Sequence, residues 1–359
     1  MVNISEDYTN QYGIIDKKGN YILKPQYNEI KPLGENMVAI GKIIDAEKPY
    51  RGSKYAIGDM NGNILTDFIY YNVSNYKNGL ASANDDKNTF FIDKSGNIVK
   101  NLPIVKGSGT LDLEGDLIKA YVDFRISYLT RDGKVIWEQN KIIPLNNQYS
   151  VIEEKYKPNR DYLVYYPELQ GMEGKAEEKK ANEKLKGEDT SQKFNEKLKE
   201  LSKVKPIDSN ANLDYNYVGD FSVEFFKKQL LVLKLYGYEY HFGAAHGMPS
   251  EIYPHIDLVS GTFYQLKDLF KQGSDYVKVI SEIIGEQIKN NKEYSYVFPD
   301  AYKGIKEDQP FYVKEYALYI YFYPYDIAPY VAGFPTFKIP YTEIMNIIDT
   351  KGDFWGSFH

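Results

Sequence analysis

One pattern recurs along the first third of the chain: a short apolar run, a polar turn that ends in glycine, and a second apolar run. It occurs at residues 12–23, 55–66 and 90–101, and a weaker copy lies at 127–138. The glycines supply the positive φ that a tight connection between two strands needs. One hairpin cannot bury its own apolar face, so neighbouring hairpins must stack. The sequence therefore predicts an all-β repeat domain of stacked hairpins.

These copies resemble the WG β-repeat family over residues 11 to about 145. The first copy is the fullest match, with Tyr12-Gly13-Ile14-Ile15-Asp16, then Gly19-Asn20, then Pro25-Gln26-Tyr27-Asn28. Later copies carry Tyr or Phe where the family usually has Trp, and the third and fourth lack the Pro-x-Tyr segment. The resemblance implies a stacked β architecture with no assigned chemistry.

Three of the turns begin with an aspartate: Asp16, Asp59 and Asp93. A calcium loop needs several oxygen donors packed closely together, and each of these turns offers a single carboxylate. We expect the three side chains to bond backbone amides within their own turns.

Composition excludes several classes of function. The net charge is −6, and no concentrated basic patch of the kind that tracks phosphates is visible, which disfavours nucleic acid as a partner. No segment approaches the ~20 apolar residues that span a bilayer. Cysteine is absent, so disulfides and thiolate metal sites are excluded. The first residues lack the features of a signal peptide, so either the protein is cytoplasmic or the chain starts after an export signal or anchor.

Tyrosine is unusually frequent, with 35 residues against 18 phenylalanines and 2 tryptophans. Its apolar ring and polar tip suit half-buried strands and wet interfaces. A codon bias that favours Lys, Asn and Ile explains the enrichment equally well.

The second part of the chain changes from this pattern to mixed helix and strand patterns. Residues 161–170 predict a strand that ends at Pro167, and 172–203 are rich in Glu and Lys. Apolar residues in that charged stretch fall at helical spacing, which favours a helix packed on a sheet over a linker; they are Ala181, Leu185, Phe194, Leu198 and Leu201.

Beyond Pro206 apolar residues alternate, which predicts strands that bury one face. A helix is expected at 276–290, a strand at 317–325 and a short helix within 339–349. We therefore predict a β-repeat domain at 1–147 and an α+β domain, an antiparallel sheet packed with helices, at 148–359.

A second resemblance covers residues 150 to about 350. Its motifs run Asp257-Leu258-x-Ser260-Gly261, then Tyr321-Phe322-x-Pro324-Tyr325-x-Ile327-Ala328-Pro329-Tyr330, then Ile339-Pro340-Tyr341. They look like the extracellular module of lysozyme-sensing anti-sigma factors and the accessory module of some peptidoglycan deacetylases. The deacetylase metal motifs are missing, so the resemblance implies a binding module without the enzyme. Where the family has a Gly-Gly-Ala-His loop, this chain has Gly243-Ala244-Ala245-His246.

His246 is open to three interpretations. A catalytic triad would need a nucleophile such as Ser250 and an orienting acid such as Asp257 to converge on it, and no nucleophile elbow is present. A metal site is disfavoured because His241, His246 and His255 lack a known ligand spacing. The favoured interpretation is structural, since small residues permit close backbone approach and the imidazole can bond a carbonyl.

We therefore expect no catalytic residue, no metal and no cofactor. The expected function is that of a non-enzymatic, extracytoplasmic protein of a cell envelope, at the surface or secreted, which binds a lysozyme-like protein or a peptidoglycan-type glycan. The expected contact surface consists of His246, Tyr240, Phe242, Ala244 and Tyr253. The alternatives are a cell-wall hydrolase that uses His246 with Asp257 or Glu251, and a structural interaction scaffold.

Overall fold

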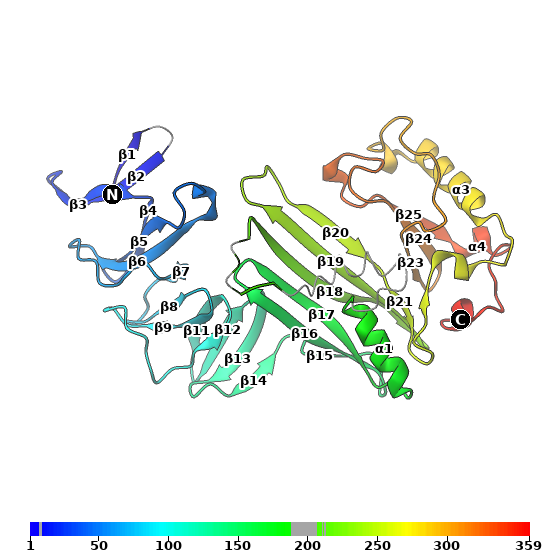
Figure 1. Ribbon diagram of the computed structural model, residues 1–359, viewed down its shortest axis with the longest axis horizontal. Helices are drawn as coiled ribbons and strands as arrows, with labels where there is room; N and C mark the ends of the chain where they lie inside the picture. The colour runs from blue at the N-terminus through cyan, green and yellow to red at the C-terminus, as the bar shows by residue number, and fades with distance from the viewer. Residues whose placement is uncertain (7–8, 188–206, 210, 212) are drawn as a thin grey trace. The chain divides into compact units, whose positions relative to one another are not determined.

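The computed structural model describes residues 1–6, 9–187, 207–209, 211 and 213–359 (Figure 1). These residues fall into two compact units. The first is formed mainly by residues 1–140, and the second by 141–157, 161–207 and 213–359.

Four small antiparallel sheets make up the first unit, in chain order. The first sheet contains β1 (Val2–Glu6), β2 (Thr9–Ile15) and β3 (Tyr21–Tyr27). The second contains β4 (Glu29–Gly34), β5 (Met37–Ile43) and β6 (Ser53–Asp59). The third contains β7 (Asn72–Val73), β8 (Ala81–Asn84), β9 (Asn88–Ile92) and β10 (Val105–Lys106). The fourth contains β11 (Gly109–Glu114), β12 (Leu117–Val122), β13 (Arg125–Thr130) and β14 (Val135–Glu138). This is the stacked β-repeat architecture that the sequence predicts.

Aspartate side chains hold the repeat turns closed, as expected. Asp59 Oδ1 accepts hydrogen bonds from the backbone N–H groups of Asn61 and Asn63, each at 2.9 Å. Its Oδ2 accepts a third bond from the Asn63 side chain at 2.8 Å. Asp16 and Asp93 make equivalent bonds in their own turns. The carboxylate oxygens thus accept hydrogen bonds from groups within their own turns.

The predicted hairpins are complete in the first and fourth copies and only partial in the two in the middle. β2 pairs with β3 and β13 pairs with β14 across their turns. After Gly62 and Gly96, however, the second run makes only one isolated bridge to the strand before it, at Ile64 and Ile98. The chain then leaves for the next sheet, whose strands pair with one another instead.

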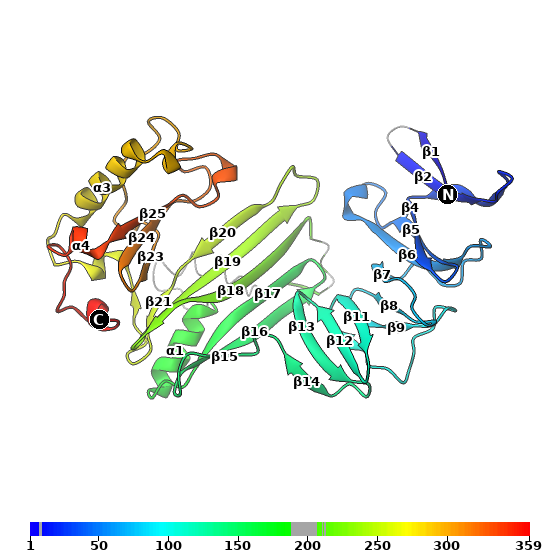
Figure 2. The same cartoon turned by 180° about the vertical axis from the view of Figure 1, so that it is seen from behind.

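A long sheet dominates the second unit (Figure 2), and it is antiparallel except for the parallel pairing of β17 with β18. Its strands are β15 (Ile142–Pro144), β16 (Ser150–Asn159), β17 (Tyr162–Gln170), β18 (Tyr215–Lys227), β19 (Leu230–His241), β20 (Met248–Ile252), β21 (His255–Asp257) and β22 (Phe263–Tyr264). β18 and β19 form its centre and pair along their whole lengths. β20 continues from β19 as the return strand of a hairpin.

Helix α1 (Lys175–Leu185) packs against β17. Ala181 and Leu185 are fully buried in the core between the helix and the sheet, as their spacing predicts. The predicted stripe of Phe194, Leu198 and Leu201 lies outside the described residues. β17 continues past Pro167 to Gln170, beyond the end of its pairing with β18 at Val164, so the prediction that the strand ends at Pro167 is wrong.

A three-stranded sheet and several helices complete this unit. The strands are β23 (Phe311–Lys314), β24 (Ala317–Tyr321) and β25 (Thr336–Pro340). The helices are α3 (Tyr276–Asn290), α4 (Tyr341–Ile344) and α5 (Asp353–Gly356). α3 has the predicted bounds, and its Ile280 and Ile284 are buried in a core that also includes Leu230 and Val232 of β19. The start of β19 is therefore buried on both faces, and its far end is not.

Candidate functional site: the tip of the β19–β20 hairpin

Residues 242–247 form the loop that connects the far end of β19 to β20. Its first turn is closed by a hydrogen bond from the Ala244 N–H to the His241 carbonyl, at 3.0 Å. The Tyr240 hydroxyl donates to the Ala244 carbonyl, and the Gly247 N–H donates to the Tyr238 hydroxyl at 2.9 Å. Small residues allow these close approaches, and the tyrosines of β19 hold the loop in one conformation.

His246 is exposed, and it is held by residues from a distant part of the chain. Its ring stacks on that of Tyr330, with centroids 4.0 Å apart and planes inclined by 25°. Its Nδ1 lies 3.0 Å from the Gly247 carbonyl, and its Nε2 lies 3.4 Å from the Tyr325 hydroxyl. The expected bond to a backbone carbonyl is present, and two tyrosines fix the ring in addition.

These contacts bring two segments together into one aromatic surface. Tyr325 and Tyr330 come from the segment between β24 and β25, and their rings lie 5.8 Å apart. Tyr240 and Phe242 come from β19 and the residue after it, with rings edge to face at 6.3 Å. We call the following residues the tip surface: Tyr238, Tyr240, Phe242, Ala244, His246, Tyr325 and Tyr330. All are at least partly exposed.

Tyrosine hydroxyls also cover the outer edge of β20. Tyr330 donates to the Gly247 carbonyl at 2.8 Å, and Tyr321 donates to the Glu251 carbonyl at 3.3 Å. Partial burial and the Tyr238 hydroxyl raise the pKa of Tyr330. Pro249, between the two carbonyls, has no N–H to offer a further strand. The outer edge of β20 is therefore poorly suited to pair with a further strand. A partner at this edge would have to be recognised by side chains.

Tyr253 does not belong to the tip surface. It is 6% exposed and lies in the core, where its ring stacks on Tyr312 at 4.5 Å. Burial and the neighbouring Glu251 carboxylate raise the pKa of its hydroxyl, which donates to that carboxylate. The expectation that Tyr253 is available to a partner is therefore corrected: the strand that carries it turns into the core immediately after β20.

Asp257 has a structural role at the opposite end of the hairpin. Its carboxylate accepts four hydrogen bonds, from the backbone N–H groups of Val259 and Ser260 and from the side chains of Gln229 and Tyr264. It pairs with Leu230 at the start of β19, whereas the His246 loop sits beside Tyr238. Eight residues of strand at ~3.3 Å each put the two sites roughly 25 Å apart. Asp257 cannot act together with His246.

Glu251 is buried and already paired. Its Oε2 lies 2.6 Å from the Lys234 ammonium, and Oε1 accepts the Tyr253 hydroxyl. A carboxylate in this position neutralises a neighbouring charge and is shielded from solvent. Neither acid proposed for a hydrolase is therefore placed for catalysis.

His241, His246 and His255 do not form a cluster. His241 contacts Glu239 at the tip, and His255 is buried beside Phe311, far along the hairpin. Among the described residues no group of three or more His, Cys, Asp or Glu side chains could hold a metal ion.

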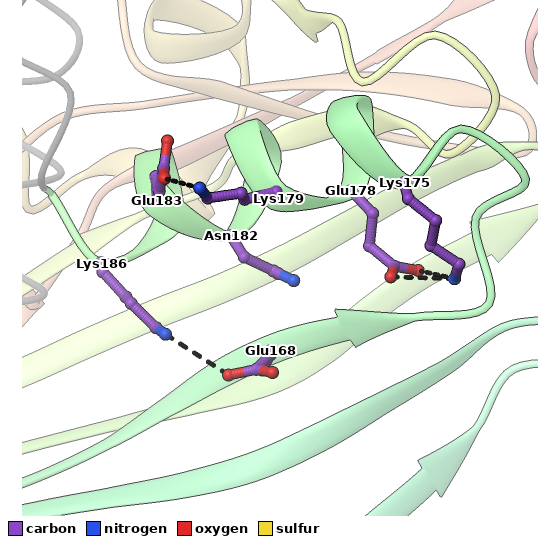
Figure 3. A pocket seen from close by; sticks show the side chains of 7 residues that line it. All are labelled: Glu168, Lys175, Glu178, Lys179, Asn182, Glu183 and Lys186. Atoms are coloured by element: carbon purple, nitrogen blue, oxygen red, sulfur yellow. Dashed lines mark hydrogen bonds and ion pairs between the residues drawn. The ribbon is translucent and has the colours of Figure 1, made fainter.

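A polar hollow lies between α1 and β17 (Figure 3). Its charged residues neutralise one another: Lys186 with Glu168, and Lys175 with Glu178. Asn182 is committed to both backbone groups of Leu169. These side chains fasten the helix to the sheet, so we do not regard the hollow as a ligand site.

Comparison with known proteins agrees with this architecture. The model of the WG containing repeat matches residues 12–42 and 59–88, and that of a protein family of unknown function, DUF3298, matches 267–342. The anti-sigma-V factor RsiV of Bacillus subtilis (strain 168) is 32% identical over 217 residues, which cover 58% of this chain and 72% of that protein. The chain belongs to the RsiV family.

Solved structures of two DUF3298 proteins also align with it. One from Bacteroides fragilis shares 17% identity and covers 58% of this chain and 95% of its own, with a TM-score of 0.42. One from Pseudomonas aeruginosa, also 17% identical, covers 57% and 95%, with a TM-score of 0.38.

Membership of the RsiV family indicates a sensing or binding role, and the relative it rests on is named for anti-sigma activity rather than for catalysis. No helix among the described residues is long and apolar enough to cross a membrane.

Sequence reasoning missed three members of the tip surface: Tyr238, Tyr325 and Tyr330. Tyr325 and Tyr330 belong to a motif that carries the family resemblance, so the sequence marked both residues as part of the module. Their proximity to His246 could not be predicted, because a contact across some 80 residues depends on how two sheets pack.

Proposed function

We propose that this protein is a non-enzymatic, extracytoplasmic sensor or binding protein of a cell envelope, and that the tip surface recognises a protein partner of the lysozyme-like kind. The observation that carries the proposal is the exposed stack of His246 on Tyr330, with Tyr325 at its edge. Family membership supports the sensing role.

Preorganised aromatic side chains are typical of binding hot spots. They offer large contact areas, and little conformational entropy is lost when they are already held in place. Here the rings of two separate segments fix one another, and the hydroxyls of Tyr238 and Tyr330 are tied to Gly247. A partner would meet a rigid surface.

Charge favours a basic partner. Residues 141–359 carry 27 Lys and Arg against 32 Asp and Glu, whereas the loop 242–250 contains no Lys, Arg, Asp or Glu, so the charge argument rests on the unit as a whole. Complementary charge speeds association and disfavours acidic partners. A basic protein surface fits this unit better than an acidic one.

Calorimetric titration of the whole chain with lysozyme, and separately with soluble peptidoglycan fragments, tests the proposal. We expect lysozyme to bind, and His246→Ala combined with Tyr325→Gly to weaken binding at least tenfold. Tyr316→Ala is the matched control, because this exposed tyrosine precedes β24 and lies at its opposite end.

Unchanged affinity in the double variant would move recognition away from the tip. Binding of the fragments alone would favour a glycan as the ligand, and failure of both ligands to bind would overturn the lysozyme-like assignment.

A further inference from the structure

The turns of the first unit form a row. The Gly62 turn packs so closely on Ile22 of the preceding copy that an added Cβ would lie 2.9 Å from it. The Gly96 turn packs in the same way on Thr66, and the Gly133 turn on Pro103. Each turn thus rests on the second run of the copy before it or, for Gly133, on a residue just beyond that run, and the turns follow one another in chain order.

This row exposes an apolar side chain at the same place in every copy, two residues after the turn glycine. The exposed fractions are 52% for Tyr21, 41% for Ile64, 42% for Ile98 and 47% for Val135. We call these four residues the apolar row. A large exposed apolar side chain at one position is ordinary, but its recurrence at four equivalent positions requires an explanation.

Lysines accompany the apolar row. Lys17 and Lys18 are exposed in the first turn, and Lys100 is exposed two residues after Ile98. Within the part of the chain that the structure describes, these three ammonium groups form no ion pair. The Asp16 carboxylate accepts hydrogen bonds within its own turn and keeps its charge, so it offsets one of the two lysines there and the first turn keeps a net positive charge.

We propose that the apolar row and its lysines bind the surface of an anionic lipid bilayer. Apolar side chains would enter the boundary between headgroups and acyl chains, while the ammonium groups would contact anionic headgroups. This binding is peripheral and independent of the tip surface, which lies in the other unit.

The chemistry of the row favours lipid over other occupants. Three of its four residues are aliphatic, whereas a glycan site uses flat aromatic faces with polar groups beside them. The side chains project singly from turns rather than lining a groove, and the Asp–Asn bonds hold those turns rigid. A row of single apolar projections with cations alongside suits a laterally fluid surface.

Co-sedimentation of the whole chain with vesicles tests the inference. We expect binding to vesicles of phosphatidylglycerol mixed with phosphatidylcholine, and much weaker binding to phosphatidylcholine alone. The variant Ile64→Ser with Ile98→Ser should lower the partition coefficient by about tenfold or more. Ile44→Ser with Tyr50→Ser is the matched control, because these residues are 36% and 52% exposed at the other end of β6.

Lys17→Gln with Lys18→Gln should reduce binding to the anionic vesicles alone, and added salt should do the same to the unaltered chain. Circular dichroism would show that each variant is folded. No binding to anionic vesicles at low salt would overturn the proposal, and so would equal losses in the apolar-row variant and its control.

Discussion

The imidazole of His255 accepts a hydrogen bond from the backbone N–H of Val313, with 3.2 Å between Nε2 and N. This bond joins β21 of the long sheet to β23 of the small sheet. The ring is also stacked on Phe311 at 4.3 Å and is almost completely buried. Because Nε2 accepts, it carries no proton, and a protonated ring could not make the bond.

His255 should make the second unit sensitive to mild acid. Burial lowers its pKa from 6.5 to about 3, so between these values the unfolded chain binds a proton that the folded chain does not. Its contribution to the free energy of unfolding is complete above the unfolded pKa and is lost as the pH falls toward 3, at up to about 1.4 kcal/mol per pH unit. Urea unfolding at several pH values from 7 to 4 measures this slope. His255→Gln should flatten it, and an unchanged slope would remove this histidine as the cause.

Two turn glycines with the same φ should differ in how they tolerate alanine. Gly19 and Gly62 both have φ +87°, a conformation that costs an alanine roughly 1 kcal/mol. An added Cβ at Gly19 meets nothing within 4 Å, whereas at Gly62 it meets both the side chain and the carbonyl of Ile22 at 2.9 Å. We expect Gly62→Ala to cost at least about 1 kcal/mol more than Gly19→Ala in urea unfolding. Equal costs would mean that the copies do not pack as described.

The Lys234–Glu251 pair should matter far more than a comparable pair at the surface. The Glu251 side chain is 8% exposed, so Lys234→Met would leave a buried carboxylate without its counter-charge, at a cost of about 3 kcal/mol or more. Lys186 pairs with Glu168, whose side chain is 42% exposed, and it lies over an aromatic ring as Lys234 does. Lys186→Met should cost less than about 1 kcal/mol in the same unfolding measurement. Similar losses of unfolding free energy in the two variants would contradict the burial of the Glu251 carboxylate.

Local patterns in the sequence predicted much of this fold. Helix α3 has the predicted bounds because its apolar residues recur at helical spacing along an uninterrupted segment. The repeat turns were found because positive φ and an aspartate cap leave a short, recognisable pattern. The partial hairpins after Gly62 and Gly96 could not be predicted, since the choice between local pairing and departure to the next sheet is made by tertiary contacts.

The site was predictable in part. The small residues around Ala244 and the aromatic residues of β19 marked the loop, and His246 does bond a carbonyl. Tyr253 was misplaced because alternation along a strand does not reveal that a second sheet covers its continuation. Tyr325 and Tyr330 needed the packing of that same second sheet to reach His246.

The backbone of Tyr325 offers a separate test of whether the tip surface is built for binding. Its φ of 71° is an outlier for a bulky residue, a conformation that costs of order 1–3 kcal/mol and is retained where other contacts require it. Glycine relieves the strain and alanine does not, so Tyr325→Gly should be more stable than Tyr325→Ala by about 1 kcal/mol in urea unfolding.

If the side chain is held there for recognition, both variants should lose affinity for the partner equally, although their stabilities differ. Calorimetric titration of the two variants separates these effects. Should the glycine variant instead bind as the unaltered chain does, the Tyr325 side chain would be neither a contact residue nor a support that His246 needs for binding.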